Sequence, residues 1–368
     1  MKWKEELRHN ITQAGEVKDL LKLDLADEEQ MCRILERFPM TIPRYYFSLI
    51  DCGNPDNDPI RKMCIPSIGE TDLSGDFDTS GEAENTVMPG MQHKYAETAL
   101  ILSTNRCAMY CRHCFRKRLV GISDDETAEN VKEMAAYVEN HKEINNVLIS
   151  GGDAFLNSNE VIREYLENFS RISHLDMIRF GTRTPVTLPM RIYEDMELIE
   201  MLKQYSRKKK IYIVTQVNHP KELTDEVKRA VNLLLEAGIM IKNQTVLLKG
   251  VNDSGDTLGR LLRELTSCGI IPYYIFQCRP VTGVQKQFQV PLKLGYKIVE
   301  TAKNQQNGQG KCLRYIMSHV TGKIEILGNL PDGQMLFKYH QAKDKKKMGH
   351  IFTRKLRDDQ TWMDQNQV

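Results

Sequence analysis

The sequence has little that would place the protein in a membrane, in an export pathway or on a charged polymer. No stretch approaches the roughly 18 continuous apolar residues of a membrane-spanning helix, and the first thirty residues lack the apolar segment of an export signal. The 51 basic and 49 acidic residues leave a formal net charge of +2, so no strong field attracts nucleic acid or an anionic membrane. We expect a cytoplasmic protein without nucleic-acid or membrane partners.

The signs of disorder are also absent. Hydrophobic residues make up 41% and charged residues 27% of the chain, which are ordinary values for a soluble globular protein. The 368 residues exceed one typical domain, yet an α/β barrel often uses about 200 to 250 residues as a single unit. We therefore expect one catalytic domain with additions at its termini.

Short apolar runs alternate with amphipathic segments from Thr98 onward, the pattern of parallel strands joined by helices. The six predicted strands are ALILST, NNVLISGG, MIRFGT, IYIVTQ, IKNQTVLL and YYIFQ. This predicts an α/β fold, a partial (β/α)6 TIM-type barrel over residues 91–284. Residues 1–90 are predicted to form a helical and irregular lead-in. Residues 285–368 are predicted to form an extension with a hairpin (RYIMSHV and KIEILG) and an exposed helix or frayed end in its last thirty residues.

Three of the nine cysteines lie within eight residues, in CAMYCRHC. In a reducing compartment, clustered thiols indicate a metal site rather than disulfides. Cys107, Cys111 and Cys114 follow the first predicted strand, at the barrel end where chemistry collects. Three thiolates can hold one cubane and leave its fourth iron open. Zinc is less favoured, because a structural zinc site uses four ligands and His113 is awkwardly placed between two of the cysteines.

The CxxxCxxC loop resembles the signature of radical S-adenosylmethionine (SAM) enzymes, although His113 stands where that superfamily usually has an aromatic residue. The resemblance implies a 4Fe-4S cluster on the three cysteines, SAM on the open iron, and a one-electron donor such as flavodoxin or ferredoxin. Reduction would cleave SAM and generate a 5'-deoxyadenosyl radical. The segment ISGGD resembles the glycine-rich stretch beside the SAM amino group, and its candidate residues are Ser150, Gly151, Gly152 and Asp153.

A closer resemblance, to the lysine 2,3-aminomutase (KamA) family, runs from Trp3 to about Pro280. It rests on YYFSLID, MPGMQHKY, CAMYCRHCFRKRLVG, LISGGDAFL, GTRTPVTLP, NHPKELT and PYYIFQC, among others. The resemblance implies a 2,3-aminomutase, an isomerase that moves an amino group between neighbouring carbons of an amino acid with the help of pyridoxal 5'-phosphate (PLP). In such enzymes PLP supplies electronic stabilisation and the protein supplies position. The family also implies a homo-oligomer.

The resemblance assigns roles to particular residues. Arg116 would hold the substrate carboxylate, a task that suits the planar guanidinium. Lys311, in GQGK, is the candidate for covalent PLP binding, and Lys323, in TGKIEI, is the other nearby lysine. The remaining candidates for contact with SAM or PLP are Lys94, Tyr95, Asn218, His219, Asn243 and Gln244.

The sequence also departs from the family pattern. Arg279, in QCRP, replaces the aspartate that would pair with the distal ammonium of lysine, and a second family aspartate has no counterpart. Like charges in a partly dry site repel by on the order of several kcal/mol, which disfavours free lysine and favours a substrate with an acidic or phosphorylated distal group. No cysteine follows Cys312, so no zinc site like that of the family is predicted.

Two other functions fit the residues. One is a radical SAM enzyme that has lost PLP and abstracts hydrogen for a different reaction. The other is a non-catalytic iron-sulfur or zinc protein with a structural or electron-carrier role. The open iron argues against this last function, because a site that only carries electrons needs no vacant ligand position.

Overall fold

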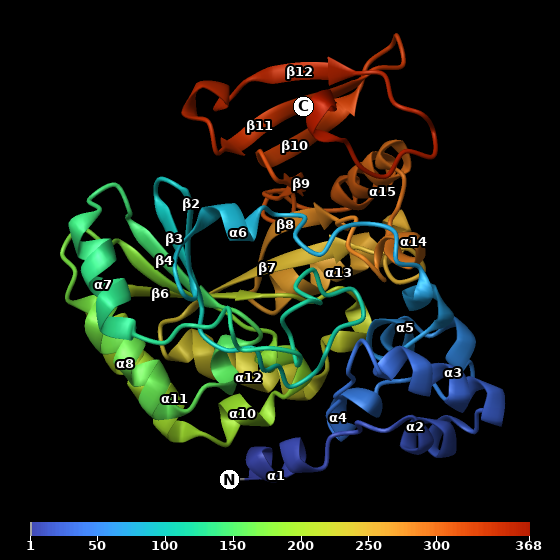
Figure 1. Cartoon of the computed structure of the whole chain (residues 1–368), viewed down its shortest axis with the longest axis horizontal. Coiled ribbons are helices and arrows are strands. Elements are labelled where there is room, and N and C mark those ends of the chain that lie inside the picture. The colour runs from blue at the N-terminus through green and yellow to red at the C-terminus, as the bar shows by residue number, and fades with distance from the viewer. Residues whose placement is uncertain (1) are drawn as a thin grey trace.

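The structure, a computed structural model, describes residues 2–368 and is built around one large twisted sheet (Figure 1). Its twelve strands are hydrogen-bonded in sequence order, and no pairing among residues 2–368 joins the first strand to the last. The strands are β1 (Thr86–Met88), β2 (Met91–Tyr95), β3 (Thr98–Leu102), β4 (Asn146–Ser150), β5 (Met177–Gly181), β6 (Lys210–Thr215), β7 (Met240–Leu247), β8 (Ile271–Gln277), β9 (Arg314–His319), β10 (Gly322–Asn329), β11 (Met335–Ala342) and β12 (Ile351–Arg354).

The six predicted strands are β3 to β8, and they pair in parallel from one to the next as a partial barrel requires. The fold class is therefore confirmed. The structure adds a seventh parallel strand, because β9 pairs in parallel with β8. β9 also forms the predicted hairpin with β10, in which His319 pairs with Gly322.

The end of the chain differs from the prediction of an exposed helix or frayed end. β11 and β12 extend the sheet in antiparallel fashion instead. The physical reason is apolar packing, since the ring of Phe352 stacks on that of Phe337 with centroids 5.5 Å apart. Met363, further along, is also fully buried.

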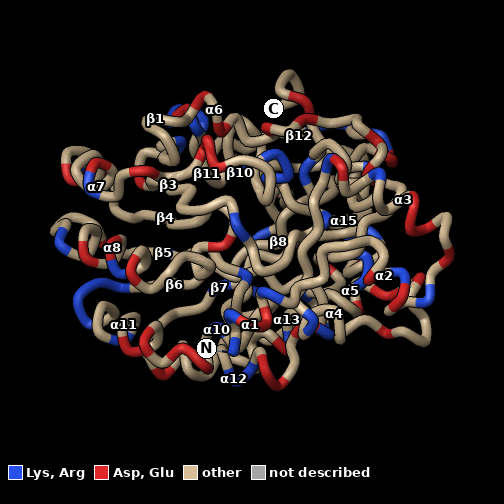
Figure 2. Tube along the Cα trace, turned by 60° about the horizontal axis from the view of Figure 1, so that its bottom comes forward, with Lys and Arg blue, Asp and Glu red and all other residues tan. Residues whose placement is uncertain are grey.

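The long predicted helices between the strands are confirmed, and each begins at a residue whose side chain caps its first turn. They are α7 (Val131–Asn140), α8 (Asn159–Ser170), α11 (Met196–Ser206), α12 (Asp225–Glu236) and α13 (Gly255–Ser267), capped by Asn130, Ser158, Asp195, Thr224 and Ser254. Such caps satisfy backbone N–H groups that have no partner within the helix. Basic and acidic residues are interspersed along the chain in the view of Figure 2.

The remaining helices are shorter, apart from α3 (Leu25–Leu35) and α15 (Leu292–Asn304). The other α-helices are α1 (Lys2–Arg8), α2 (Ala14–Leu21), α4 (Arg44–Phe47), α5 (Pro59–Cys64), α6 (Glu82–Asn85), α9 (Thr184–Thr187), α10 (Met190–Tyr193) and α14 (Gln285–Phe288). The 3-10 helices are η1 (Pro55–Asn57), η2 (Ile68–Thr71), η3 (Ala154–Leu156), η4 (Pro220–Glu222), η5 (Lys345–Lys347) and η6 (Gln365–Gln367). Among residues 2–368, no helix has the length and apolar character needed to cross a bilayer.

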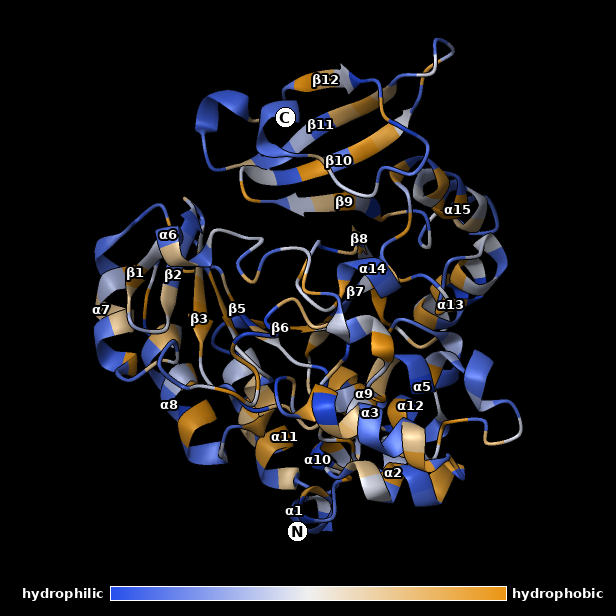
Figure 3. Cartoon of the chain, turned by 45° about the vertical axis from the view of Figure 1, so that its right-hand side comes forward, coloured by the Kyte–Doolittle hydropathy of each residue, from blue (hydrophilic) through white to orange (hydrophobic). Residues whose placement is uncertain are grey.

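Alternation along the strands separates the core from the interior of the barrel. In β4, Val147 and Ile149 are fully buried on the side of the helices, whereas Leu148 and Ser150 line a cavity on the other side. Apolar colour is concentrated on the strands and on the inner faces of helices such as α11 (Figure 3). Neighbouring residues of a strand therefore lie on opposite faces of the sheet, and this alternation determines which predicted site residues line the cavity.

Candidate active site

A cavity of about 560 Å³ runs along the inner side of the parallel strands and reaches the edge formed by their carboxyl-terminal ends. This is the edge where αβ barrels gather their chemistry, because the loops that follow each strand meet there. The cavity is lined by residues of β3 to β8, by the loop after β3 and by Lys323 of β10. Cys107, Cys111 and Cys114 all belong to the lining.

The three cysteines are partly buried on one loop, and no disulfide joins them. Among residues 2–368, no group of three or more His, Cys, Asp or Glu side chains converges on a single metal ion. A cubane makes no such demand, because each cysteine binds a different iron of the cluster. Burial raises the pKa of Cys107 and raises that of Cys114 to about 11, so loading a cluster would release protons from these thiols. Soft sulfur donors on one cavity wall fit an iron-sulfur cluster.

A buried ion network holds the cysteine loop against the N-terminal region. Glu70, on η2, accepts hydrogen bonds from Arg112 Nε at 2.8 Å and from Lys117 Nζ at 2.5 Å. Lys117 also donates to the carbonyl of Arg112 at 3.0 Å. Burial opposes the charge of Glu70, but Arg112 and Lys117 hold its pKa below the ordinary value. The two cations flank Cys114 in the sequence, so one carboxylate fixes the loop on both sides of it.

We predict that Glu70→Gln will destabilise the protein, because two buried cations lose their carboxylate. Breaking a buried ion pair from one side costs about 3–5 kcal/mol of unfolding free energy. The exposed pair of Glu84 with Lys343 provides the control, and Glu84→Gln should change stability by less than about 1 kcal/mol. Denaturant unfolding of the two variants measures the difference, and equal effects would contradict the role assigned to Glu70.

The glycines of ISGGD allow β4 to meet the cysteine loop closely. Gly151 has φ of 111°, and a Cβ on Gly152 would lie 2.2 Å from the carbonyl oxygen of Arg106. The Gly152 N–H donates to Thr104 O at 2.6 Å. Asp153 accepts from the Arg183 N–H at 2.7 Å and caps η3. Ser150, Gly151, Gly152 and Asp153 all line the cavity, as predicted for a segment that contacts a ligand.

Arg116 and Arg279 lie on one aromatic ring in the cavity. Their guanidinium carbons are 4.6 and 4.5 Å from the centroid of Phe115. Arg116 is paired with the buried Glu82, from Nη2 to Oε1 at 2.9 Å. Arg279 donates from Nη2 to Ser318 Oγ at 2.8 Å, and its buried Nη1 has no hydrogen-bond partner within the described chain. Burial lowers the pKa of Arg279 to about 10, so it remains a cation at neutral pH.

Two lysines and an aromatic ring complete this side of the cavity. Lys94 donates to the carbonyl oxygens of Ser80 at 2.9 Å and His319 at 3.1 Å. Lys323 donates to Gln341, and its Nζ lies 4.6 Å from the ring centroid of Tyr95. Burial, with the nearby cations, lowers the pKa of Lys323 to about 7 and that of Lys94 to about 8. A lysine with such a pKa has a large neutral, nucleophilic fraction at physiological pH.

Lys311 does not reach the cavity. It is exposed, in the turn between α15 and β9, where its N–H donates to Asn307 O at 3.2 Å. β9 runs parallel to β8. A turn that leads into β9 therefore lies at the amino-terminal edge of the sheet, away from the cysteine loop, and Lys311 is not among the residues that line the cavity. Lys323 follows the hairpin turn at the other end of β9, where it pairs with Ser318 and lines the cavity.

Alternation and capping also separate the other predicted contacts. Gln244 lines the cavity, but Asn243 faces away and bonds the Val217 N–H at 2.7 Å. Asn218 is buried outside the lining and accepts from the Val246 N–H at 2.9 Å. The ring of His219 caps η4 by accepting from the Lys221 N–H at 3.1 Å. Asn218, His219 and Asn243 thus shape the loops, whereas Lys94, Tyr95 and Gln244 line the cavity.

Sequence reasoning missed four charged residues that line the cavity, Glu82, Arg179, Arg183 and Lys242. Arg179 and Lys242 line the cavity from β5 and β7. Their signal was present, because each is the only charged residue of its strand. Glu82, the partner of Arg116, lies on the four-residue α6 in an irregular segment that gave no such signal.

A cavity at strand ends, with three cysteines on the loop after the first parallel strand, is the arrangement of a radical SAM enzyme. The profile described as "Radical SAM superfamily" matches residues 101–262. The chain belongs to the lysine 2,3-aminomutase family, as its relatives show. It is accordingly an enzyme, an aminomutase-like radical SAM isomerase, and its superfamily uses a 4Fe-4S cluster and SAM.

The relatives match nearly the whole chain. A protein of Aquifex aeolicus with the provisional name L-lysine 2,3-aminomutase is 39% identical over 345 residues, which are 93% of this chain and 91% of that protein. L-lysine 2,3-aminomutase of Acetoanaerobium sticklandii is 39% identical over 311 residues, 83% of this chain and 73% of that protein. Glutamate 2,3-aminomutase of Clostridioides difficile is 35% identical over 310 residues, 83% of this chain and 71% of that protein.

Proposed function

We propose that the protein moves the amino group of an acidic α-amino acid between C2 and C3, with PLP bound in the cavity through Lys323. The observation that carries the proposal is that Lys323 lines the cavity and Lys311 does not. When bound, PLP supplies the electronic stabilisation that lets the amino group migrate after hydrogen abstraction. The cluster ligands in this proposal are Cys107, Cys111 and Cys114.

The charges of the cavity support two anionic ligands. Among residues 2–368, Lys94, Arg279 and Lys323 form no ion pair with a carboxylate, although all three line the cavity. Buried cations without counterions are costly, and an anionic ligand offsets that cost. The phosphate of PLP and an acidic substrate would supply the missing charges. Within residues 2–368, the ionisable groups that shift the pKa of Lys323 are all cations, which disfavours a substrate ammonium beside it.

Within this cavity the residues divide the work. Arg116 is held by Glu82 and can present its remaining N–H groups to the substrate carboxylate. Arg279 offers the unpartnered Nη1 to the distal group of the substrate. Gly151 and Gly152 bring the end of β4 next to the cysteine loop, where SAM would bind. The relatives include a glutamate 2,3-aminomutase as well as lysine 2,3-aminomutases, so the family accommodates an acidic substrate.

Arg279→Asp tests the substrate class. The purified chain is reconstituted anaerobically with iron, sulfide and PLP, reduced, and given SAM with L-glutamate or L-lysine. We expect the native enzyme to favour glutamate in kcat/KM by at least about tenfold, the equivalent of about 1.4 kcal/mol, and Arg279→Asp to lose that preference. Arg279→Lys keeps the charge and is the control. Unchanged preference in Arg279→Asp would remove Arg279 from the substrate site.

The same assay separates this proposal from a PLP-independent radical SAM enzyme. That alternative predicts 5'-deoxyadenosine without lysine-bound PLP. Lysine-bound PLP together with 5'-deoxyadenosine supports the aminomutase. If a chain loaded with cluster gave neither lysine-bound PLP nor 5'-deoxyadenosine, the electron-carrier role would be favoured.

A further inference from the structure

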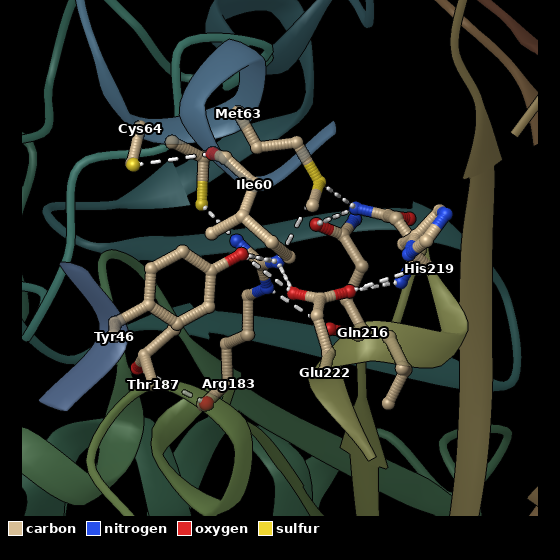
Figure 4. Close-up of polar contacts among 12 residues, drawn as sticks. Tyr46, Ile60, Met63, Cys64, Arg183, Thr187, Gln216, His219 and Glu222 are labelled. Carbon is tan, nitrogen blue, oxygen red and sulfur yellow. Dashed lines mark hydrogen bonds and ion pairs between the residues drawn. The ribbon is translucent and has the colours of Figure 1, made fainter. Parts of the chain in front are cut away.

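A largely buried arginine in the cavity lining contacts one of the cysteines. Arg183 follows β5 and precedes α9. Its Nη1 is 2.8 Å from the sulfur of Cys111. In Figure 4 its guanidinium lies between Tyr46 and Glu222. The contact joins residues 72 positions apart in the sequence, so it depends on the tertiary fold.

The other two nitrogens of Arg183 are both engaged in hydrogen bonds. Nε donates to Gln216 O at 2.9 Å, and Nη2 donates to Glu222 and to the hydroxyl of Tyr46 at 3.2 Å. Tyr46 in turn donates to the same carboxylate at 2.7 Å. Gln216, Tyr46 and Glu222 therefore fix the orientation of the guanidinium, and this orientation places Nη1 beside the sulfur of Cys111.

Glu222 is itself held rigidly. Its second oxygen accepts the backbone N–H groups of Asn218 at 2.6 Å and His219 at 3.0 Å, and its side chain is fully buried. The Arg183–Glu222 pair thus brings no net charge to the cavity wall. What it delivers is one preorganised N–H donor at a sulfur.

A thiol sulfur is a weak acceptor, so a fully anchored arginine gains little from a protonated cysteine. A thiolate bound to iron carries negative charge and accepts such a bond far better. Hydrogen bonds to the sulfurs of an iron-sulfur cluster set its reduction potential, because they stabilise the reduced, more negative state. The geometry at Cys111 fits this effect.

We propose that Arg183 is a positioning residue that raises the reduction potential of the 4Fe-4S cluster through its hydrogen bond to Cys111, with Glu222 limiting the charge that the cluster experiences. The proposal rests on Cys111 as a cluster ligand, which is part of the proposed function. It does not depend on PLP, on the substrate or on amino migration.

Two substitutions should move the potential in opposite directions. Arg183→Gln removes a cation and leaves Glu222 without its partner, so the cluster becomes harder to reduce. Glu222→Gln leaves the charge of Arg183 uncompensated beside the sulfur, so the cluster becomes easier to reduce. Arg183→Lys keeps the charge without the fork and should fall between Arg183→Gln and the native protein. A general loosening of the fold would not give opposite signs.

The experiment is an EPR-monitored redox titration of the reconstituted full chain without SAM or PLP, after iron and sulfide analysis of each variant. We expect Arg183→Gln to lower the midpoint potential by at least 59 mV, which is a tenfold change for a one-electron couple. Glu222→Gln should raise the midpoint potential.

Shifts of the same sign in Arg183→Gln and Glu222→Gln, or no shift, would overturn the proposal. So would failure of both Arg183 variants to load any cluster, which would make Arg183 an assembly residue. Loss of amino migration with these shifts intact would count against the proposed function alone.

Discussion

Cys111→Ser will leave the protein without a catalytically competent cluster and will reduce SAM cleavage to background. The three cysteines line one cavity, and each is expected to bind a separate iron, so none can replace another. Changes to residues that only support metal ligands typically cost about 10–100-fold in affinity or activity, and loss of a ligand should exceed that. Iron analysis, the visible absorbance of the cluster and 5'-deoxyadenosine formation measure the effect.

Cys312→Ser is the matched control, because Cys312 is exposed and does not line the cavity. It should keep native iron content and native SAM cleavage. If Cys111→Ser retained a full cluster and cleaved SAM at the native rate, the assignment of Cys107, Cys111 and Cys114 as the ligand set would be wrong.

Lys323→Ala will abolish covalent binding of PLP, whereas Lys311→Ala will leave it intact. Lys323 is at the cavity edge beside Tyr95, and Lys311 is exposed at the opposite edge of the sheet. Borohydride reduction followed by peptide mass spectrometry locates the modified lysine directly. We expect the label on Lys323 in the native chain, and a label on Lys311 would contradict the placement.

The pH dependence of this labelling provides an independent check. Burial and the cations Arg179, Lys94 and Arg279 lower the pKa of Lys323 from 10.5 to about 7. The amine is thus neutral above about pH 7 and reacts with PLP there. Below that pH it is protonated, and the initial rate of labelling should fall about tenfold per pH unit. A rate that continues to rise steeply up to about pH 10 would indicate an ordinary lysine.

The parallel strands and the cysteine loop were predictable from the sequence, because apolar runs of strand length and the CxxxCxxC spacing are local patterns. Which side chains of a strand share one face of the sheet was equally predictable from the sequence. Gln244 and Asn243 are neighbours in β7, so alternation allows only one of them to face the cavity. Applying that rule would have excluded Asn243.

Which of the two candidate lysines lines the cavity was not predictable in this way. Choosing between Lys311 and Lys323 requires knowing that β9 continues the parallel sheet beyond the six expected strands. That pairing is a long-range contact with β8, and no local pattern specifies it. The glycine-rich motif favoured Lys311, but a turn that enters a parallel strand lies at the edge away from the active site.

The most direct test of the account uses L-glutamate labelled with 15N at its amino group. The fully reconstituted chain, reduced in the presence of SAM, should convert it to the 3-amino isomer with the 15N retained and with 5'-deoxyadenosine detected. The same enzyme should give little isomer from L-lysine. Formation of 5'-deoxyadenosine without a 3-amino isomer from glutamate or other acidic amino acids would contradict the assignment as an aminomutase of acidic substrates.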